Sequence, residues 1–460
     1  MSVSVLNYEP LCVNLCIQYR YITFSITYQD LPLLYNAETM RTWACFQLLV
    51  AAVFAVYVLS PVVTSVDSIW TIYTATSIIR ERNLNLDEYL PLLQQSNFYA
   101  TRDVGGHRYE FFPYGTALMA VPFVWLFDWL ALRTLQIDIG ARFQELRPSG
   151  LEQLIASIIV ALAVGVFFMT IKIATGDRRA AAVAAIVLAF GTSAWSTASR
   201  ALWQHGPSML LLTVALCLSI VSRQYPRAIW ILGIVLGTAY VVRPTNAIAV
   251  VAFTVWVAWA HRRSILPYFF GLGVVLFVFV VINERTWGLS LPEYYMANRI
   301  GDNPNFLEAL AGNLVSPARG LLIFSPVLIF SAIGVWLQIV RRAFVPLELA
   351  LGAIVGAHWL AISSFAHWWG GHAYGPRLFT DMMPFLVFLL VPCIRAIVNN
   401  PTLRWRLAGL VFAGLLVISV SIHMRGATVK GTWMWNSEPV GVDEAPARLW
   451  DFRDLQFLRS

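Results

Sequence analysis

Residues 43–61 read WACFQLLVAAVFAVYVLSP, and this stretch decides the class of fold. It holds no charged side chain and approaches the ~20 apolar residues that a helix needs to cross a bilayer. The chain then turns polar at Val63-Thr-Ser-Val-Asp67-Ser68, where Asp67 is the first acidic residue after the run. We therefore expect Asp67 at the end of a membrane span, where the chain leaves lipid for water.

The composition of the whole chain agrees with this interpretation. Of its 460 residues, 58% are hydrophobic and 12% are charged, whereas about 25% are charged in a typical soluble protein. The sequence thus predicts an all-α, polytopic transmembrane protein with about eleven full spans. These spans are predicted at about 43–63, 151–172, 180–197, 205–222, 228–243, 245–261, 264–283, 318–339, 345–364, 376–395 and 404–423.

The charge and the cysteines exclude two other classes of protein. The net charge is +7, but the basic residues lie between the apolar runs, so they do not indicate a nucleic-acid partner. The five cysteines have neither the spacing of a zinc site nor that of a disulfide framework.

Basic residues gather at alternate span ends, and the positive-inside rule makes those ends cytoplasmic. The groups are Lys172 with Arg178 and Arg179, Arg223 with Arg227, His261 with Arg262 and Arg263, Arg341 with Arg342, and Arg404 with Arg406. This predicts a multi-pass protein of the cell (inner) membrane with a cytoplasmic N-terminus and an extracytoplasmic C-terminus. The alternation requires the apolar run 113–132 to be a kinked or re-entrant helix inside a first outer loop, 64–150. A twelfth full span is the alternative.

The sequence divides into three parts. Residues 1–39 have no sustained apolar run, and Met40-Arg41 opens directly onto the first span, so we interpret 1–39 as an extension that is not native. A regulatory segment is the alternative. Residues 40–423 form the transmembrane domain, with interfacial helices predicted within 68–82 and 303–313. The tail 424–460 is rich in tryptophan, so we expect it to be ordered and to pack across the mouth formed by the outer loops.

Four arginines lie at outer span ends, where the positive-inside rule does not expect them. They are Arg200, Arg243, Arg319 and Arg377. Because guanidinium groups bind phosphate with forked hydrogen bonds, an anionic phosphate ligand on the outer face is the simplest explanation. The alternative is that each arginine extends to the lipid headgroups.

Candidate substrate-binding side chains lie in the same outer segments. They are His107, Tyr109 and Glu110 of the first loop, His205 after the second, and His367, Trp368, Trp369, His372 and Tyr374 of the stretch HWWGGHAYGPR at 367–377. Its glycines permit close backbone approach, and its aromatic rings can stack on a sugar or flank a lipid. The structural alternatives are a helix cap for Asp67, hydrogen-bonded core histidines, and an aromatic belt for the tryptophan pair.

Over about residues 40–423 the sequence resembles the GT-C superfamily of membrane glycosyltransferases. The resemblance is closest to the bacterial relatives of protein O-mannosyltransferases, the dolichyl-phosphate-mannose-protein mannosyltransferase-like group. The matching positions are Asp67, the segment Phe112-Pro113-Tyr114-Gly115-Thr116, Ser199-Arg200, Arg243-Pro244, and Trp368-Trp369-Gly370-Gly371 with Gly375-Pro376-Arg377.

The resemblance implies a transferase that uses a polyprenyl-phosphate-linked sugar on the extracytoplasmic face, with a glycan, a lipid or a protein as acceptor. The acid/base role of the family's first-loop aspartate carries over to Asp67, which we expect to act as general base in an inverting displacement. We expect Arg377 and Arg319, supported by Arg243 or Arg200, to bind the donor phosphate.

The sequence departs from the family at two places that bear on metal binding. Many members carry an acidic pair in the first loop and an aspartate after the second-loop arginine. Here Ser68 follows Asp67, and His205 occupies the second place. We therefore expect no cofactor, and a divalent metal is not favoured.

Two functions of other classes stay open on the sequence alone. A transporter or flippase for a lipid-linked anion would also need intramembrane arginines and a polar cavity, but symmetric halves with interrupted helices, its usual mark, are not found. A non-catalytic assembly factor would tolerate the substitution Asp67→Ala.

Overall fold

The computed structural model describes residues 37–144, 148–296, 301, 303–343 and 345–460. The extension predicted at 1–39 therefore lies almost wholly outside the described residues. Residues 1–44 and 45–460 form two separate units. The described part of the first unit opens helix α1 (Ala37–Leu59), where the Thr42 hydroxyl donates to the Glu38 carbonyl over 2.8 Å. The fold described below is that of residues 45–460.

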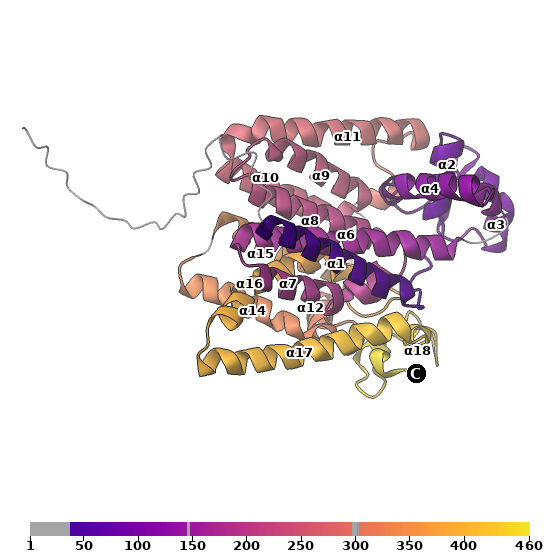
Figure 1. Ribbon diagram of the computed structural model, residues 1–460. Coiled ribbons are helices and arrows are strands. Elements are labelled where there is room, and N and C mark those ends of the chain that lie inside the picture. Colours follow the sequence, from indigo (N-terminus) through magenta and orange to yellow (C-terminus); the bar gives the residue numbers. More distant parts are fainter. Residues whose placement is uncertain (1–36, 145–147, 297–300, 302, 344) are drawn as a thin grey trace, which may run out of the picture. The chain divides into compact units, whose positions relative to one another are not determined.

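Helices and a single two-stranded hairpin make up the regular structure of the described residues. The longer apolar helices are α6 (Ser149–Thr175), α11 (Ile265–Trp287), α15 (Pro346–Ser363), α16 (Met383–Asn399) and α17 (Leu403–Thr428). The shorter ones are α7 (Arg178–Phe190), α8 (His205–Val221), α9 (Ala228–Val242), α10 (Ala247–Ala260), α12 (Phe306–Val315) and α14 (Ile329–Val340). In Figure 1, α6, α11 and α17 run in nearly the same direction across the view.

The length and composition of these helices fit a membrane. Of the described helices, seven are long and apolar enough to cross one, and the protein is a multi-pass membrane protein. The predicted all-α class is confirmed. The number of eleven full spans stays a prediction, because several apolar helices are shorter than a full crossing.

Proline decides where two of the predicted spans stop or break. Helix α1 ends at Leu59, two residues before Pro61. The span predicted at 318–339 is not continuous: it divides into α13 (Leu321–Phe324), a 3-10 turn that begins at Pro326, and α14. Proline has no backbone N–H, so it cannot donate the hydrogen bond to the preceding helical turn that would continue the helix. The break is stabilised by α17, where the Ser419 hydroxyl accepts the backbone N–H of Val327 over 3.2 Å.

Basic turns gather at one end of the bundle, which we call the basic end. The ends of α6, α8, α14 and α16 surround a cavity of about 440 Å³ there, with Arg223, Arg341 and Arg395 on its wall. Asn399 at the end of α16 donates to Asp177 before α7 over 3.0 Å. The basic groups that the sequence places at alternate span ends therefore meet at this one end.

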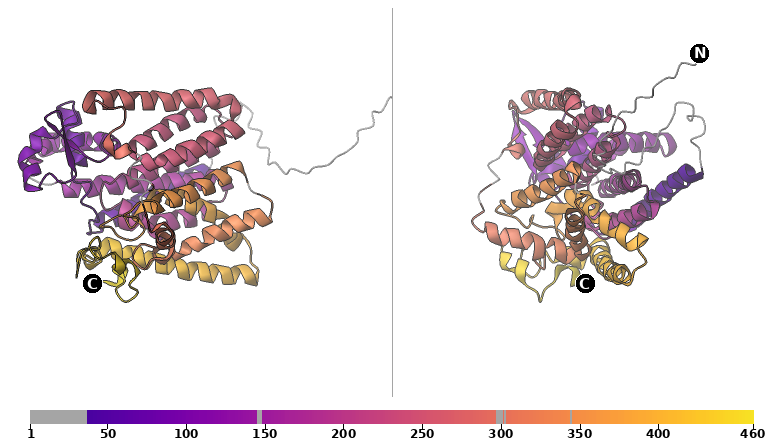
Figure 2. Two further views of the ribbon diagram at one scale, coloured as in Figure 1. Left: turned by 180° about the vertical axis from the view of Figure 1, so that it is seen from behind. Right: turned by 90° about the vertical axis from the view of Figure 1, so that its left-hand side faces the viewer.

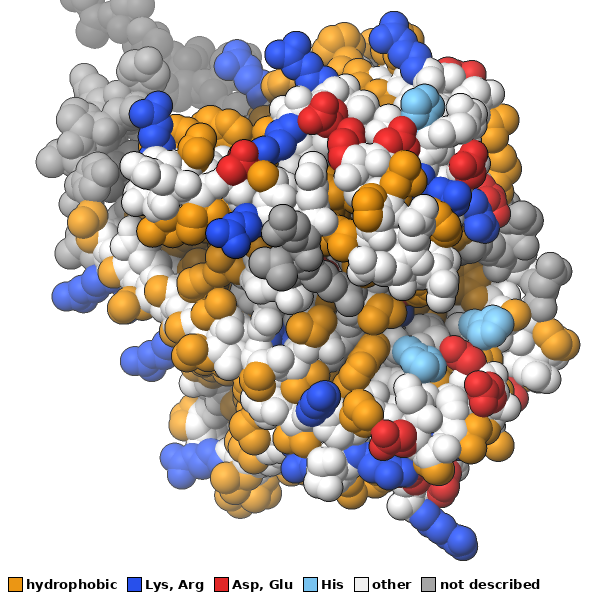
Figure 3. Space-filling view, turned by 90° about the vertical axis from the view of Figure 1, so that its right-hand side faces the viewer, with side chains coloured by type: hydrophobic (Ala, Val, Ile, Leu, Met, Phe, Trp, Pro, Cys, Tyr) orange, Lys and Arg blue, Asp and Glu red, His pale blue; other side chains and the backbone are white. Residues whose placement is uncertain are grey.

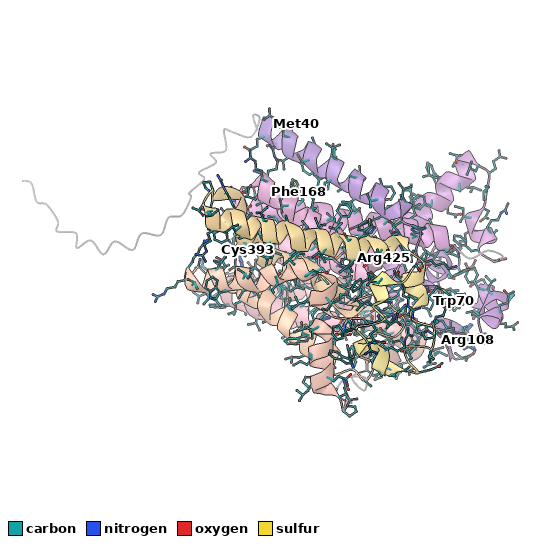
Figure 4. The ribbon with its side chains drawn as sticks, turned by 90° about the horizontal axis from the view of Figure 1, so that it is seen from below. Met40, Trp70, Arg108, Phe168, Cys393 and Arg425 are labelled. Carbon is teal, nitrogen blue, oxygen red and sulfur yellow. The ribbon has the colours of Figure 1, made fainter. Side chains whose placement is uncertain are left out.

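The opposite end carries the hairpin and is called the hairpin end. It contains α2 (Thr71–Arg80), α3 (Leu90–Gln95) and the antiparallel strands β1 (Thr101–Val104) and β2 (His107–Glu110). Gly105 and Gly106 make the tight turn, with φ of 61° and 84°, a region that favours glycine. Figure 4 shows Trp70 and Arg108 at this end and Cys393 toward the basic end. The helices predicted within 68–82 and 303–313 are present as α2 and α12.

Helix α4 (Gly115–Thr134) belongs to the hairpin end in its packing. It begins against α9, where a Cβ on Gly115 would lie 2.4 Å from the carbonyl oxygen of Val241. It then packs mainly along α2, and Arg80 of α2 pairs with Asp128 of α4 over 2.9 Å. Figures 1 and 2 show α4 at this end rather than alongside the full length of α11. Its 20 residues are long enough to cross a membrane, so the re-entrant placement predicted for 113–132 stays a prediction beside the alternative of a twelfth full span.

The tail after α17 is ordered, as predicted, and folds back on the 367–377 loop. Helix α17 continues to Thr428 and is followed by α18 (Gly431–Met434) and two 3-10 turns. Arg425 binds the end of the chain, because its guanidinium donates to the carbonyls of Phe457, Leu458 and Arg459. Trp368, Trp435 and Leu449 share one buried cluster. The tail therefore covers the loop that leads to Arg377.

Glycines allow several helix pairs to approach backbone to backbone. Helices α9 and α11 cross where a Cβ on Gly271 would lie 2.2 Å from the carbonyl oxygen of Trp230. Small residues at such crossings are the usual means of helix association in lipid, where no hydrophobic effect drives it.

We expect Gly271→Val to separate α9 from α11 and to lower stability by about 1–3 kcal/mol, the usual cost of overpacking. The measurement is the thermal unfolding midpoint of the purified protein in detergent. Gly273→Val is the matched control on the same helix, because nothing lies within 4 Å of a Cβ built at Gly273. Equal losses in both variants would show that helix flexibility, not packing, is responsible.

Candidate active site

Asp67 and Arg377 form an ion pair at the hairpin end. Their closest atoms, Asp67 Oδ2 and Arg377 Nη2, are 2.8 Å apart. The second oxygen, Asp67 Oδ1, accepts a hydrogen bond from the Tyr99 hydroxyl over 2.7 Å. The two side chains are 23% and 15% exposed, so the pair is shielded from bulk water but is not sealed off.

Arg377 is positioned by the loop that precedes it. Its guanidinium stacks on the Trp203 ring at 3.7 Å and donates to the Gly370 carbonyl over 3.1 Å. Gly375 has a φ of 58°, and a Cβ there would lie 2.6 Å from the Phe324 ring, so this turn needs glycine. The Nε atom of Arg377 is buried and has no hydrogen-bond partner among the described residues. A buried donor of this kind is costly unless a ligand satisfies it.

The surroundings of Asp67 favour its charged form. Burial opposes ionisation, but the Arg377 guanidinium and the Tyr99 hydroxyl outweigh it and hold the pKa of Asp67 below its ordinary value. Burial and the nearby Asp67 carboxylate raise the pKa of Tyr99. Asp67 is thus a carboxylate at neutral pH, with Tyr99 as a neutral donor beside it.

A buried polar cluster lies behind this pair. Arg243 Nη1 donates to Asp381 Oδ1 over 2.7 Å and also contacts the His205 ring. His205 Nδ1 is 3.2 Å from the same oxygen of Asp381. Ser208 and Asn246 extend the hydrogen bonding into α8 and α10. Asp381 is therefore the counter-ion of Arg243.

Asp67 lines a small gap that shares lining residues with two larger cavities. A gap of about 20 Å³, with room for about one water molecule, is lined by Asp67, Arg377 and Glu110. Arg377 also lines a cavity of about 720 Å³, together with Arg243 and His367. Glu110 also lines a third cavity, of about 220 Å³, between the hairpin and the end of α11. We call these the central gap, the large cavity and the small cavity. Figure 3 looks onto this end and shows acidic side chains and histidines gathered among arginines.

Glu110 is a buried carboxyl group that forms no ion pair with an arginine or lysine among the described residues. It accepts hydrogen bonds from Thr71 and Thr74 over 3.0 and 2.9 Å. Burial raises the pKa of Glu110 to about 8, against those two hydrogen bonds. Glu152 lies in the same region and accepts from the Ser68 hydroxyl and from the Leu202 amide.

Two of the predicted phosphate-binding arginines are used inside the protein instead. Arg200 is fully buried and donates to the Tyr57 and Ser60 carbonyls at the end of α1. Arg319 is 1% exposed. Its donors bind the carbonyls of Ala318, Trp369 and Gly371 and the side chains of Asn436 and Gln456. Both guanidinium groups join backbone segments, so the geometry does not place them at a ligand.

The predicted substrate-binding residues divide into three groups. His205 and His367 line the large cavity, and Glu110 lines the central gap. His107 lies outside these cavities, 2.6 Å from Asp87 on the hairpin, and the Tyr109 ring packs on Trp287. Trp368, Trp369 and Tyr374 are buried under the tail, and His372 lies 3.8 Å from Asp443 of the tail. The last group supports the loop and does not face a cavity.

Several site residues were missed by the sequence analysis. Tyr99, Trp203 and Glu152 carried no signal, because a lone tyrosine, tryptophan or glutamate beside an apolar run is ordinary. Trp203 lies between Arg200 and His205, two predicted site residues. Its position near the site could therefore have been inferred.

Among the described residues, no three histidine, cysteine, aspartate or glutamate side chains are grouped so as to hold a metal ion. The pair of His205 and Asp381 already shares Arg243.

Comparisons with known proteins give one informative match. No family model matches the chain, and no curated protein does. The chain is similar to the crystal structure of ArnT from Cupriavidus metallidurans bound to undecaprenyl phosphate, with a TM-score of 0.50 and 14% identity. The match covers 85% of this chain and 68% of the ArnT chain. ArnT is a GT-C glycosyltransferase. At this identity the likeness shows the fold, which is the GT-C fold that the sequence resemblance implied.

The raised pKa of Glu110 makes stability depend on pH. Its ordinary value is 4.5, and its value in the folded protein is about 8. Between these values the folded protein keeps a proton that the unfolded chain releases, so this contribution is complete below the ordinary value and is lost as pH rises through about 8. We expect Glu110→Gln, which imitates the protonated form, to flatten the fall in thermal midpoint between about pH 5 and about pH 9. Glu444→Gln on the surface is the control. The prediction is wrong if the thermal midpoints of the unmodified protein, Glu110→Gln and Glu444→Gln fall equally over this pH range.

Proposed function

We propose that this protein is an inverting glycosyltransferase that uses a polyprenyl-phosphate-linked sugar and acts on the extracytoplasmic face of the cell membrane. The observation that carries the proposal is the Asp67–Arg377 pair, which lines the central gap, and the gap shares lining residues with both the large and the small cavity. ArnT, whose fold this chain shares, was crystallised with undecaprenyl phosphate, and this supports the class of donor.

The large cavity suits a lipid phosphate. It lies between the ends of α8 and α9 and the loop before Arg377, and Tyr240, Phe365 and Leu378 give it apolar walls. Arg243 and Arg377 supply positive charge. A phosphate oxygen at Arg377 would satisfy the unpartnered Nε atom and would receive a forked pair of hydrogen bonds.

The reaction is a single displacement. The acceptor hydroxyl oxygen bonds to the anomeric carbon as the bond from that carbon to the phosphate oxygen breaks. Asp67 takes the hydroxyl proton, and the polyprenyl phosphate leaves with the bonding electrons. Arg377 stabilises the negative charge that develops on the leaving group. Attack opposite the leaving group inverts the anomeric centre.

The proposal assigns no metal or other cofactor a role. Both oxygens of Asp67 already accept hydrogen bonds, from Tyr99 and from Arg377. Arg377 supplies the positive charge that a divalent ion would otherwise bring to the phosphate.

We expect Asp67→Asn to lower turnover by about 10²–10⁴-fold, the usual worth of one general base. The amide keeps the shape and one acceptor oxygen but cannot take a proton. The assay follows release of labelled sugar from a panel of polyprenyl-phosphate sugars by purified protein. Asp451→Asn in the tail is the control. Near-normal turnover in Asp67→Asn would show that Asp67 is not the general base. Movement of the intact donor across vesicle membranes without sugar transfer would favour a transporter.

Arg377 and Arg319 should respond differently to the same substitution. Arg377→Lys keeps the charge but loses the fork, so we expect the KM for the donor to rise by about tenfold, or ~1.4 kcal/mol, at unchanged thermal stability. Arg319→Lys should lower the thermal midpoint instead, because Arg319 holds the tail on the loop. An unchanged donor KM in Arg377→Lys would contradict the phosphate contact.

A further inference from the structure

The small cavity lies on the other side of the central gap from the large one. It is built from the hairpin, the segment before α4, the end of α11 and the turn at 293–295. Glu110, Phe112 and Pro113 line both the small cavity and the central gap that holds Asp67. A group bound in the small cavity therefore lies next to the gap that holds the proposed base. The proposed function leaves the chemical class of that group open.

Aromatic rings form most of the cavity wall. Trp287 stacks on Tyr114, with ring centres 5.7 Å apart and an angle of 19° between the planes. Tyr294 packs edge-on against Phe111 and Phe112, each at 5.6 Å. Trp287, Phe111, Phe112 and Tyr294 are only partly buried. Trp287 also packs against the Tyr109 ring, with centres 5.5 Å apart and 50° between the planes. The part of the Trp287 ring that stays exposed is suited to stack on a flat, weakly polar ring.

Tyr114 supplies a polar group without a partner. The residue is 4% exposed, and its buried hydroxyl makes no hydrogen bond to any residue that the structure describes. Burial raises the pKa of Tyr114, so the hydroxyl stays neutral and can both donate and accept. A buried hydroxyl without a hydrogen-bond partner lowers the stability of the protein, and a ligand hydroxyl would supply that partner.

The charges on the wall argue against an anionic ligand. Asp103 and Glu293 bring two carboxylates to the wall, with Arg102 as the one basic side chain among its lining residues. Glu110 also lines the cavity, but burial raises its pKa to about 8 and keeps it neutral at neutral pH. Arg102 is already paired with Glu293 over 3.0 Å and lies over the Phe111 ring at 4.6 Å. A phosphate or carboxylate placed there would face more like charge than unlike charge.

We propose that the small cavity binds the acceptor as a sugar ring, so that the acceptor is a carbohydrate hydroxyl carrying no phosphate. The proposal rests on the proposed function and names its acceptor class. The ring stacks on Trp287, one of its hydroxyls pairs with Tyr114, and another reaches the central gap, where Asp67 takes its proton. About 220 Å³ is below the ~300–1,000 Å³ of drug-sized sites, which suits one ring rather than a folded peptide.

The test compares acceptors and variants in one assay. Full-length protein in lipid nanodiscs is given radiolabelled undecaprenyl-phosphate sugars, and release of label to water is measured alongside transfer to methyl glycosides, to a serine- and threonine-containing peptide, and to glycerol phosphate. We expect transfer to the glycosides. Trp287→Leu should raise the glycoside KM by about fivefold or more, from the loss of one stacking contact, with a smaller effect on the donor KM. Trp259→Leu, an exposed residue of α10, is the control.

Tyr114→Phe separates binding from a structural role. Because the hydroxyl has no partner in the described part of the chain, its removal should leave the thermal midpoint unchanged or raised, while the glycoside KM rises several-fold. Preference for the peptide or for glycerol phosphate, or an unchanged glycoside KM in both variants, overturns the acceptor class and leaves the donor chemistry standing. If no sugar is released to water or to any acceptor, the proposed function and this inference both fail.

Discussion

The ion pair between Asp67 and Arg377 is the constraint around which the hairpin end is organised. Only 12% of the residues are charged, and the side chains of this pair are 23% and 15% exposed. Removing two charges from water is costly, so the pair is stable only if its geometry is fixed by neighbouring groups. The loop after α1 provides the carboxylate, Trp203 provides a face for the guanidinium, and Gly370 provides a carbonyl. These groups come from three distant parts of the sequence. The ion pair therefore forms only when these three parts of the chain pack together, and the helix bundle fixes its position.

The other buried arginines show how that packing is maintained. Arg200 fastens the end of α1 through backbone carbonyls, and Arg319 joins the 367–377 loop to the tail through Asn436 and Gln456. Arg243 is neutralised by Asp381. Of the four arginines predicted at outer span ends, Arg377 is the one with a buried donor that has no partner in the described structure. That difference, rather than position along the chain, makes Arg377 the candidate for ligand binding among the four.

This explains how far the sequence could predict the molecule. Apolar runs and helical spacing predict α2, α12 and most of the long helices, because these signals are local. The aromatic content of the tail likewise predicts its order. The partners of Arg200 and Arg319 are backbone carbonyls and amide side chains far away in the chain, and such partners have no sequence pattern. Glu152 and Tyr99 were missed for the same reason. Asp67 and Arg377 were found because a charge at a span end is unusual in itself.

Under the proposed function, the same pair would also link donor binding to catalysis. Arg377 holds the pKa of Asp67 below its ordinary value, so the free protein keeps a weak base. A donor phosphate at Arg377 would compete with Asp67 for the guanidinium and bring a negative charge close to the carboxylate, and both effects raise a carboxyl pKa. Asp67 would therefore become a stronger base when the donor is in place. The central gap has room for about one water molecule, so few waters could reach the activated sugar before the acceptor does.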